Sequence, residues 1–161
     1  MIRRHLPDDA ATRLLAELLA AHQPRGAVVH LQGDLGAGKS TLARAWLRAL
    51  GVTGTVRSPT YTLVERYPVE GGEALHLDLY RIGDAGELDF LGLDDIDAEL
   101  WLIEWPERGA AALAPADLEI HLAIDGAGRS VELVPDGQGG NAWLAALLDD
   151  PRLSTLPEPK P

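Results

Sequence analysis

The sequence predicts an α/β fold in which a mixed sheet is flanked by helices. A β-branched apolar run at residues 27–31 is followed by a glycine-rich segment and then by apolar residues at helical spacing between 40 and 50. Two alternating runs, residues 61–67 and 73–80, enclose a Gly-Gly pair, which is the pattern of an antiparallel hairpin. With 161 residues, 46% of them hydrophobic, the chain can bury one core, so we expect a single domain over residues 1–150.

The two longer helices have recognisable ends. The first begins after Asp8 or Asp9, either of which can cap it, and it ends before Pro24. Its apolar face comprises Leu14, Leu15, Leu18 and Leu19. The second, over residues 40–50, ends at Gly51, because glycine favours the backbone conformation that closes a helix.

The second half of the chain predicts shorter elements. These are a short helix and loops in the acidic stretch 84–99, a strand over 100–105, two closing strands at 118–124 and 130–134, and a terminal helix at 142–148. The last residues, 151–161, are rich in proline, and we expect a disordered tail there.

Residues 33–40, Gly-Asp-Leu-Gly-Ala-Gly-Lys-Ser, match the phosphate-binding pattern G-x-x-x-x-G-K-S and stand between the first expected strand and helix. The glycines let consecutive backbone N–H groups converge on phosphates. Lys39 supplies a positive charge to the β and γ oxygens, and Ser40 supplies a hydroxyl for magnesium. The fold expectation thereby becomes a P-loop NTPase-like sheet with the hairpin inserted after the P-loop helix. The loop also predicts that the protein binds a nucleoside triphosphate.

Two carboxylates are candidates for the same site. Glu104 ends an apolar strand, where a magnesium carboxylate is expected, although a solvent-exposed strand end is the alternative. Asp78 lies inside an expected strand, where aspartate is disfavoured, and shares a face with His76 and Tyr80. The alternative for Asp78 is the wet face of a hairpin, paired with Arg81.

Ser58-Pro59-Thr60 lies between the P-loop helix and the hairpin, where nucleotide switches place a hydroxyl that senses the γ-phosphate. A turn or strand start is the commoner structure for such a tripeptide, because serine and proline are ordinary turn residues. Trp105 directly follows Glu104 and is a candidate neighbour of the nucleotide. Four arginines are candidates for phosphate or partner contacts: Arg57, Arg81, Arg108 and Arg129. The five histidines show no metal-binding spacing.

Composition excludes several classes of protein. A formal net charge of −11 argues against direct nucleic-acid binding, which requires a basic surface. The absence of cysteine excludes disulfides, thiolate metal sites and a cysteine nucleophile. No apolar stretch approaches the roughly 18 residues of a membrane span, and residues 1–7 lack the apolar core of a signal peptide. We therefore expect a soluble cytoplasmic enzyme.

Four segments occur together in this order: residues 33–41 (Gly-Asp-Leu-Gly-Ala-Gly-Lys-Ser-Thr), 58–64 (Ser-Pro-Thr-Tyr-Thr-Leu-Val), 76–81 (His-Leu-Asp-Leu-Tyr-Arg) and 103–105 (Ile-Glu-Trp). In this combination the chain resembles the TsaE family, small bacterial ATPases required for threonylcarbamoyladenosine formation at position 37 of tRNAs that read codons beginning with A. The first segment is shared by all P-loop proteins, whereas the combination is much more specific.

The resemblance implies ATP and Mg²⁺ as ligands. Lys39, Asp78 and Glu104 would form the catalytic set, with Asp78 assisting hydrolysis, and Ser40 and Glu104 would coordinate magnesium. The nucleotide-binding residues would be Gly33, Gly36, Ala37, Gly38, Lys39, Ser40, Thr41 and Thr60. The implied partners are the TsaD and TsaB proteins, so tRNA would be reached only through that complex. The loop ends in Lys-Ser where many members have Lys-Thr, which keeps the hydroxyl.

Three other functions share parts of the pattern. A small-molecule or nucleotide kinase uses the same loop but needs an acceptor site and a lid, and we find no arginine-rich lid segment. A GTPase is supported only by D-x-x-G matches, at residues 89–92, 125–128 and 136–139, and the single asparagine, Asn141, forms no N-K-x-D motif. A nucleotide-gated adaptor that barely hydrolyses ATP would share every feature of the binding site.

Overall fold

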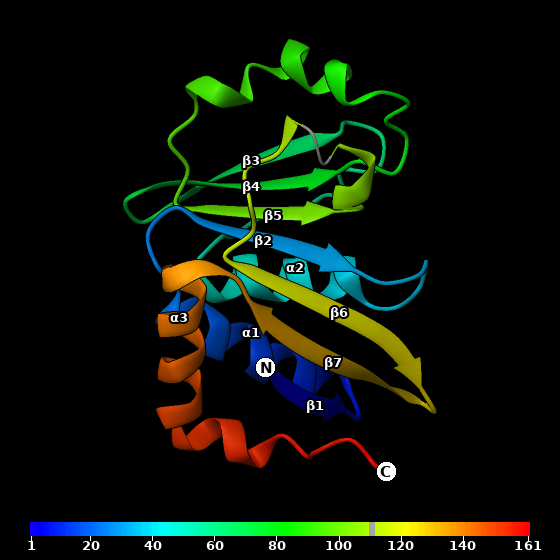
Figure 1. The fold of residues 1–161 in the computed structure, drawn as a ribbon, viewed down its shortest axis with the longest axis vertical. Coiled ribbons are helices and arrows are strands. Elements are labelled where there is room, and N and C mark those ends of the chain that lie inside the picture. Colours follow the sequence, from blue (N-terminus) through cyan, green and yellow to red (C-terminus); the bar gives the residue numbers. More distant parts are fainter. Residues whose placement is uncertain (110–111) are drawn as a thin grey trace.

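A seven-stranded mixed sheet organises the chain (Figure 1). The structure is a computed structural model that describes residues 1–109 and 112–161. Its strands are β1 (Ile2–Leu6), β2 (Ala27–Gln32), β3 (Val64–Val69), β4 (Gly72–Asp78), β5 (Leu100–Glu104), β6 (Leu118–Asp125) and β7 (Gly128–Pro135). Its α-helices are α1 (Asp9–His22), α2 (Lys39–Ala49) and α3 (Gly137–Asp149). Short 3₁₀ helices are η1 (Ala85–Leu91), η2 (Leu93–Asp95), η3 (Pro106–Arg108) and η5 (Pro151–Thr155).

The centre of the sheet is parallel. The strand order is β1-β7-β6-β2-β5-β4-β3, in which β2 pairs in parallel with β5 and β6, and β4 pairs in parallel with β5. The register places Leu31 of β2 and Asp78 of β4 on either side of Glu104 in β5. Because parallel strands end at the same edge of a sheet, the carboxyl ends of β2, β5 and β4 lie together.

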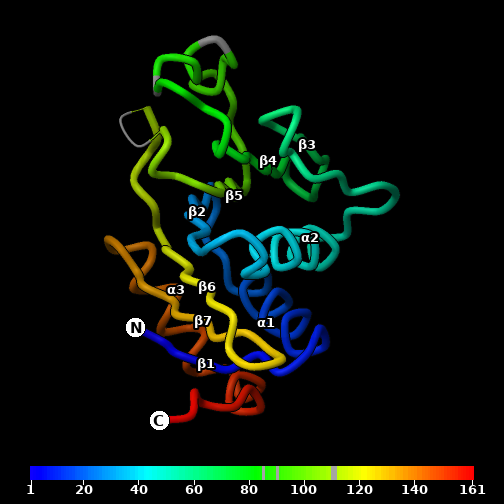
Figure 2. Tube along the Cα trace, turned by 90° about the vertical axis from the view of Figure 1, so that its right-hand side faces the viewer, coloured from blue at the N-terminus to red at the C-terminus, as the bar shows by residue number. Residues whose placement is uncertain are grey.

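Helices α1 and α2 lie on the same side of the sheet (Figure 2). Asp8 caps α1, since its side chain accepts a hydrogen bond from the backbone N–H of Ala11 at 2.9 Å. Apolar residues of β2 and β5 pack with those of both helices in the larger core. Helix α3 joins this core through Trp143, whose ring meets Trp46 edge-on at a centroid distance of 5.7 Å. In the described parts of the chain, no helix has both the length and the apolar character needed to cross a membrane.

Strand β4 is buried on both faces. Leu75, Leu77 and Leu79 contribute to a second core cluster with Ile103 of β5 and Leu88 of η1. The opposite face of β4 carries two polar residues, His76 and Asp78, and both are buried. The alternative in which Asp78 lines the wet face of a hairpin, paired with Arg81, is therefore wrong, because Asp78 is buried. Arg81 lies over the ring of Tyr61 instead.

The expected mixed sheet flanked by helices is confirmed, and so is the antiparallel hairpin after α2. Its first strand begins at Val64 rather than at residue 61, since Leu63 has a positive φ of 67° that interrupts extended backbone. Strand β1 is not predicted by the sequence pattern. It has only five residues, three of them polar, but it pairs with β7 and buries Ile2 and Leu6.

The expectation of a disordered tail over residues 151–161 does not hold for its first part. Residues Pro151–Thr155 form η5, which contacts α1 and α3, and the backbone N–H of His5 donates to the carbonyl of Pro157 at 2.7 Å. Leu153 and Leu156 are buried in the main core. Two leucines three residues apart give this segment an apolar face that the proline content obscures.

We expect Leu153→Ala to destabilise the protein by about 2–5 kcal/mol, because truncating a buried leucine loses packing and leaves a cavity. The matched control is Leu148→Ala on α3, whose side chain is 59% exposed and which we expect to cost about 0.5 kcal/mol or less. Urea unfolding of both variants measures the difference. Equal, small effects would show that residues 151–156 do not pack on the domain in solution.

Candidate functional site

The glycine-rich loop joins β2 to α2 and is shaped by residues that tolerate a positive φ. Gly33 has a φ of 148°, and a Cβ atom there would collide with the carbonyl oxygen of Leu122. Gly38, with a φ of 104°, forms the N-cap of α2 without a side chain that caps it. The first backbone N–H groups of α2 therefore face the loop with the positive end of the helix dipole behind them.

Lys39 is the first residue of α2 and is buried. Its Nζ donates to the carbonyl of Gly33, lies 3.5 Å from the carbonyl of Asp34, and sits 3.9 Å from the ring centroid of Trp105. Burial lowers the pKa of the Lys39 ammonium, and the nearby carboxylates of Glu104 and Asp78 oppose that shift. The loop carbonyls and the indole thus hold the ammonium group next to the carboxylates.

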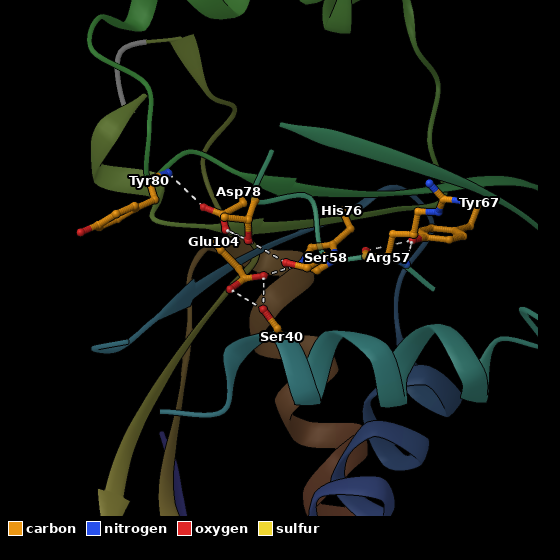
Figure 3. Close-up of polar contacts among 9 residues, drawn as sticks. Ser40, Arg57, Ser58, Tyr67, His76, Asp78, Tyr80 and Glu104 are labelled. Atoms are coloured by element: carbon orange, nitrogen blue, oxygen red, sulfur yellow. Dashed lines mark hydrogen bonds and ion pairs between the residues drawn. The ribbon is translucent and has the colours of Figure 1, made fainter. Parts of the chain in front are cut away.

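Glu104 ends β5 and accepts hydrogen bonds from two other elements (Figure 3). The hydroxyl of Ser40, in the first turn of α2, lies 3.2 Å from Oε1 and 3.1 Å from Oε2 of Glu104. On the strand side, Nε2 of His76 lies 2.6 Å from Oε2. Glu104 is only 3% exposed, so the alternative of a solvent-exposed strand end is wrong.

Asp78 lies beside Glu104 in the parallel pair β4–β5 and is 7% exposed. Its Oδ1 accepts from the backbone N–H of Tyr80 at 3.0 Å, and its Oδ2 accepts from the Thr60 hydroxyl at 3.4 Å. The hydroxyl of Ser58 lies 2.7 Å from that of Thr60. The Ser58–Thr60 segment is therefore linked to Asp78 through hydroxyl contacts.

The segment before the hairpin is fixed at both ends and turns between them. The Tyr67 hydroxyl accepts from the backbone N–H of Arg57 at 3.0 Å and lies 3.2 Å from its carbonyl (Figure 3). The backbone N–H of Leu63 donates to the carbonyl of Pro59 at 2.9 Å. Residues 59–62 form a turn, as the serine and proline of this segment predict. The turn presents Thr60 to Asp78.

A cleft of about 250 Å³ opens over the loop and the first turn of α2. Seven of the eight predicted nucleotide-binding residues line it: Gly36, Ala37, Gly38, Lys39, Ser40, Thr41 and Thr60. Asp78 and Glu104 line it as well. Gly33 lies behind the loop, where its carbonyl accepts from Lys39. The structure thus gathers every predicted site residue around one cleft or directly behind it.

Three further residues line this cleft, and a fourth, His76, contacts Glu104 from outside it. Trp105 and Arg129, which the sequence marked as candidates for nucleotide or phosphate contacts, line the cleft. The guanidinium of Arg129 donates to the carbonyl of Gly36 at 3.1 Å. Tyr80 also lines the cleft, and its ring packs against that of Trp105 at a centroid distance of 4.9 Å. His76 was not predicted as a site residue. The only sequence signal for it is its position two residues before Asp78, on the same face of the strand.

The donor set of the cleft suits a hard divalent cation. Ser40 supplies a hydroxyl and Glu104 a carboxylate within 3.2 Å of each other, and magnesium prefers oxygen ligands of this kind. Within residues 1–109 and 112–161, no group of three or more His, Cys, Asp or Glu side chains could hold a metal ion. Magnesium in phosphate sites needs no such cage, because it binds one or two protein oxygens together with phosphates and waters.

A larger hollow of about 560 Å³ lies on the other side of β2. Trp105 lines both this hollow and the cleft. Its described lining includes the carboxylates of Asp34, Glu107 and Glu119 and no lysine or arginine. Burial lowers the pKa of His30, which also lines it. A negatively charged phosphate chain is therefore better accommodated in the smaller cleft.

Comparisons with known proteins agree with one another. The family profile described as "Threonylcarbamoyl adenosine biosynthesis protein TsaE" matches residues 6–131. The tRNA threonylcarbamoyladenosine biosynthesis protein TsaE of Haemophilus influenzae is 38% identical over 152 residues, which cover 90% of this chain and 96% of that protein. The protein of the same name from Synechocystis is 40% identical, over 64% of this chain and 69% of that protein. The crystal structure of Bacillus subtilis YdiB superposes with a TM-score of 0.75 at 27% identity, covering 91% of this chain and 93% of that one.

Proposed function

We propose that this protein, which belongs to the TsaE family of tRNA threonylcarbamoyladenosine biosynthesis proteins, is a magnesium-dependent ATPase. One observation carries the proposal: the loop, the Ser40 hydroxyl and the buried pair Asp78 and Glu104 all face one cleft. Buried carboxylates are costly unless they are paired, so their concentration beside Lys39 indicates a site for a charged ligand.

The phosphates are bound by the loop and α2. Backbone N–H groups at the start of α2 point into the cleft, and the helix dipole favours negative charge there. Lys39 exchanges the carbonyls of Gly33 and Asp34 for the β and γ oxygens, which are better acceptors for an ammonium group. The ammonium group is already desolvated, so its attraction to phosphate is stronger than that of a surface lysine.

Ser40 and Glu104 would hold the magnesium ion. When bound, the ion would supply positive charge that neutralises the phosphate oxygens. The two ligands come from α2 and β5 and are 3.1–3.2 Å apart before the metal binds, so little rearrangement is needed.

Asp78 orients the attacking water. Its Oδ1 is held by the backbone N–H of Tyr80, and its Oδ2 faces Thr60 through a weak contact of 3.4 Å. A carboxylate fixed on one oxygen and loosely held on the other can accept a hydrogen bond from water beside the γ-phosphate. Thr60 is placed to respond to that phosphate, since the same hydroxyl can turn from Asp78 to a phosphate oxygen.

ATP hydrolysis supports formation of threonylcarbamoyladenosine at position 37 of tRNAs that read codons beginning with A, through a complex with the TsaB and TsaD proteins. The charge of the chain supports an indirect role: with a net charge of −11, the protein alone repels the phosphates of tRNA. The protein therefore acts on the partner complex rather than on the nucleic acid.

The runner-up is a small-molecule kinase. The larger hollow beside Trp105 favours it, because that volume adjoins the cleft and could receive a phosphoryl acceptor. A kinase and an ATPase differ in where the γ-phosphoryl group goes: to an acceptor or to water.

We expect Lys39→Ala to weaken binding of ATP with magnesium by at least about 100-fold, because it removes the charge that meets the β and γ oxygens. The chain has one other lysine, Lys160, and Lys160→Ala should bind like the wild type. Isothermal titration calorimetry measures both affinities. Wild-type hydrolysis by the Lys39 variant would show that the loop does not bind the triphosphate.

Glu104→Ala and Asp78→Ala should fail at different steps. Loss of Glu104 should raise the magnesium concentration needed for nucleotide binding, since a metal ligand is removed. Loss of Asp78 should leave ATP bound but slow its turnover by about 10²-fold or more, as expected when a general-base interaction is removed. Asp94→Ala, at an exposed position in η2, is the control. Unchanged turnover in the Asp78 variant would assign that carboxylate a structural role.

Association with a TsaB–TsaD pair should depend on the nucleotide and on Thr60. We expect tighter association with ATP than with ADP, and loss of that difference in Thr60→Ala, because Thr60 is the hydroxyl proposed to sense the γ-phosphate. Thr62→Ala is the matched control, since the exposed Thr62 hydroxyl donates to Glu65 at 2.9 Å and Thr62 does not line the cleft. Sedimentation or surface plasmon resonance measures the affinities. Association that ignores both nucleotide and Thr60 would remove this switch, and tight tRNA binding by the protein alone would contradict the electrostatic argument.

A further inference from the structure

His76 is one of five polar or charged residues that are buried in the described chain, together with Thr12, Lys39, Asp78 and Glu104. Three of the other four belong to the proposed nucleotide site, whereas His76 is 2% exposed and does not line the cleft. It lies in β4 opposite Leu102 of β5. It stands two residues before Asp78 and therefore further from the carboxyl end of the strand, where the cleft opens. His76 is therefore too deep to touch a ligand in the cleft.

The contact that His76 makes has a definite direction. Because an ionised carboxylate only accepts hydrogen bonds, the Nε2 of His76 carries the hydrogen of the 2.6 Å contact with Oε2 of Glu104. The single hydrogen of the Ser40 hydroxyl is within reach of both Glu104 oxygens, whereas the His76 Nε2–H bonds Oε2 alone. This leaves Oε1 as the less occupied oxygen, which is the one free to serve a cation in the cleft.

The other ring nitrogen of His76 shows that packing alone does not explain the residue. Nδ1 is buried and has no hydrogen-bond partner among the residues that the structure describes. An apolar side chain would fill this position without leaving a polar atom unpaired, so the histidine carries a desolvation cost. The short bond from Nε2 to Glu104 offsets this cost.

Without His76, Glu104 has a competing partner. The Lys39 ammonium and the Glu104 carboxylate line the same cleft, and a freed carboxylate would be drawn toward the opposite charge. Such an ion pair would occupy both the phosphate-binding lysine and the magnesium-binding carboxylate.

We propose that His76 is a positioning residue: its Nε2–H holds the Glu104 carboxylate toward the magnesium position and keeps it from pairing with Lys39. The proposal deepens the proposed function and rests on it, since it concerns how this chain prepares its metal ligand. His76 acts only through Glu104 and touches neither nucleotide nor metal.

The test is nucleotide binding measured by calorimetry with ADP, at increasing magnesium and also in excess EDTA, so that no turnover is involved. His76→Leu should raise the half-saturating magnesium concentration about tenfold or more, in line with loss of a group that orients a metal ligand. Its affinity for ADP in EDTA should not fall, because the loop and Lys39 remain. His76→Gln, which can still present an N–H to Glu104, should recover most of the wild-type magnesium dependence.

Two further variants separate positioning from general damage. His121→Leu is the matched control, since its Nε2 lies 3.4 Å from Glu119 on the surface, and it should behave like the wild type. In a Glu104→Ala background, His76→Leu should cause no additional loss of magnesium dependence. If His76→Leu does not fold, as judged by thermal unfolding, His76→Asn replaces it, because that shorter side chain keeps a polar group but withdraws the donor from Glu104.

An unchanged magnesium requirement in folded His76→Leu or His76→Asn would overturn the proposal. So would an equal loss of affinity with magnesium and in EDTA, which is the result expected from disruption of the whole site. A wild-type protein that binds no nucleotide under either condition would instead refute the proposed function itself.

Discussion

The parallel pairing of β2, β5 and β4 is the constraint on which the site depends. It places the last residues of three strands at one edge of the sheet, with Asp78 opposite Glu104 and with the glycine-rich loop leaving β2 beside them. This register is strongly specified, because a slip of β4 by one residue against β5 would turn Asp78 to the face opposite Glu104, into the second core cluster. Helix α2 then starts directly above these carboxylates, and Ser40 completes the contact. The chemistry therefore follows from strand register rather than from loop conformation alone.

The charged residues at this edge do not serve stability. Lys39, Asp78 and Glu104 are nearly inaccessible to water, and desolvation of paired charges costs as much as their attraction returns in many proteins. Such a desolvation cost is tolerated at a binding site, because a phosphate group and a magnesium ion would meet groups that are already desolvated and oriented. The cluster is negative on the strand side and positive at the loop, which would suit a magnesium ion held by Ser40 and Glu104 and a phosphate chain beside Lys39.

Local patterns in the sequence were sufficient to predict much of the fold and most of the site. The loop follows from its complete motif, and Glu104 and Asp78 stand out as acids at the end of or inside apolar strands. The pairing order of the strands had no local signal, so the depth of Asp78 and the contact from His76 to Glu104 could not be foreseen. Strand β1 and the packed segment around Leu153 were missed for a related reason. Both are short and polar or proline-rich by composition, and only their neighbours in space make them part of the core.

The central claim is that the γ-phosphate is passed to water in a cycle that serves a partner complex. The most direct measurement is release of inorganic phosphate from ATP by the purified protein, with and without a TsaB–TsaD pair, using Lys39→Ala to subtract background. We expect slow release by the protein alone and at least about tenfold stimulation by the pair, comparable with rate gains from completing a catalytic site. Release that the pair does not change, or phosphoryl transfer to a small acceptor in place of water, would contradict it.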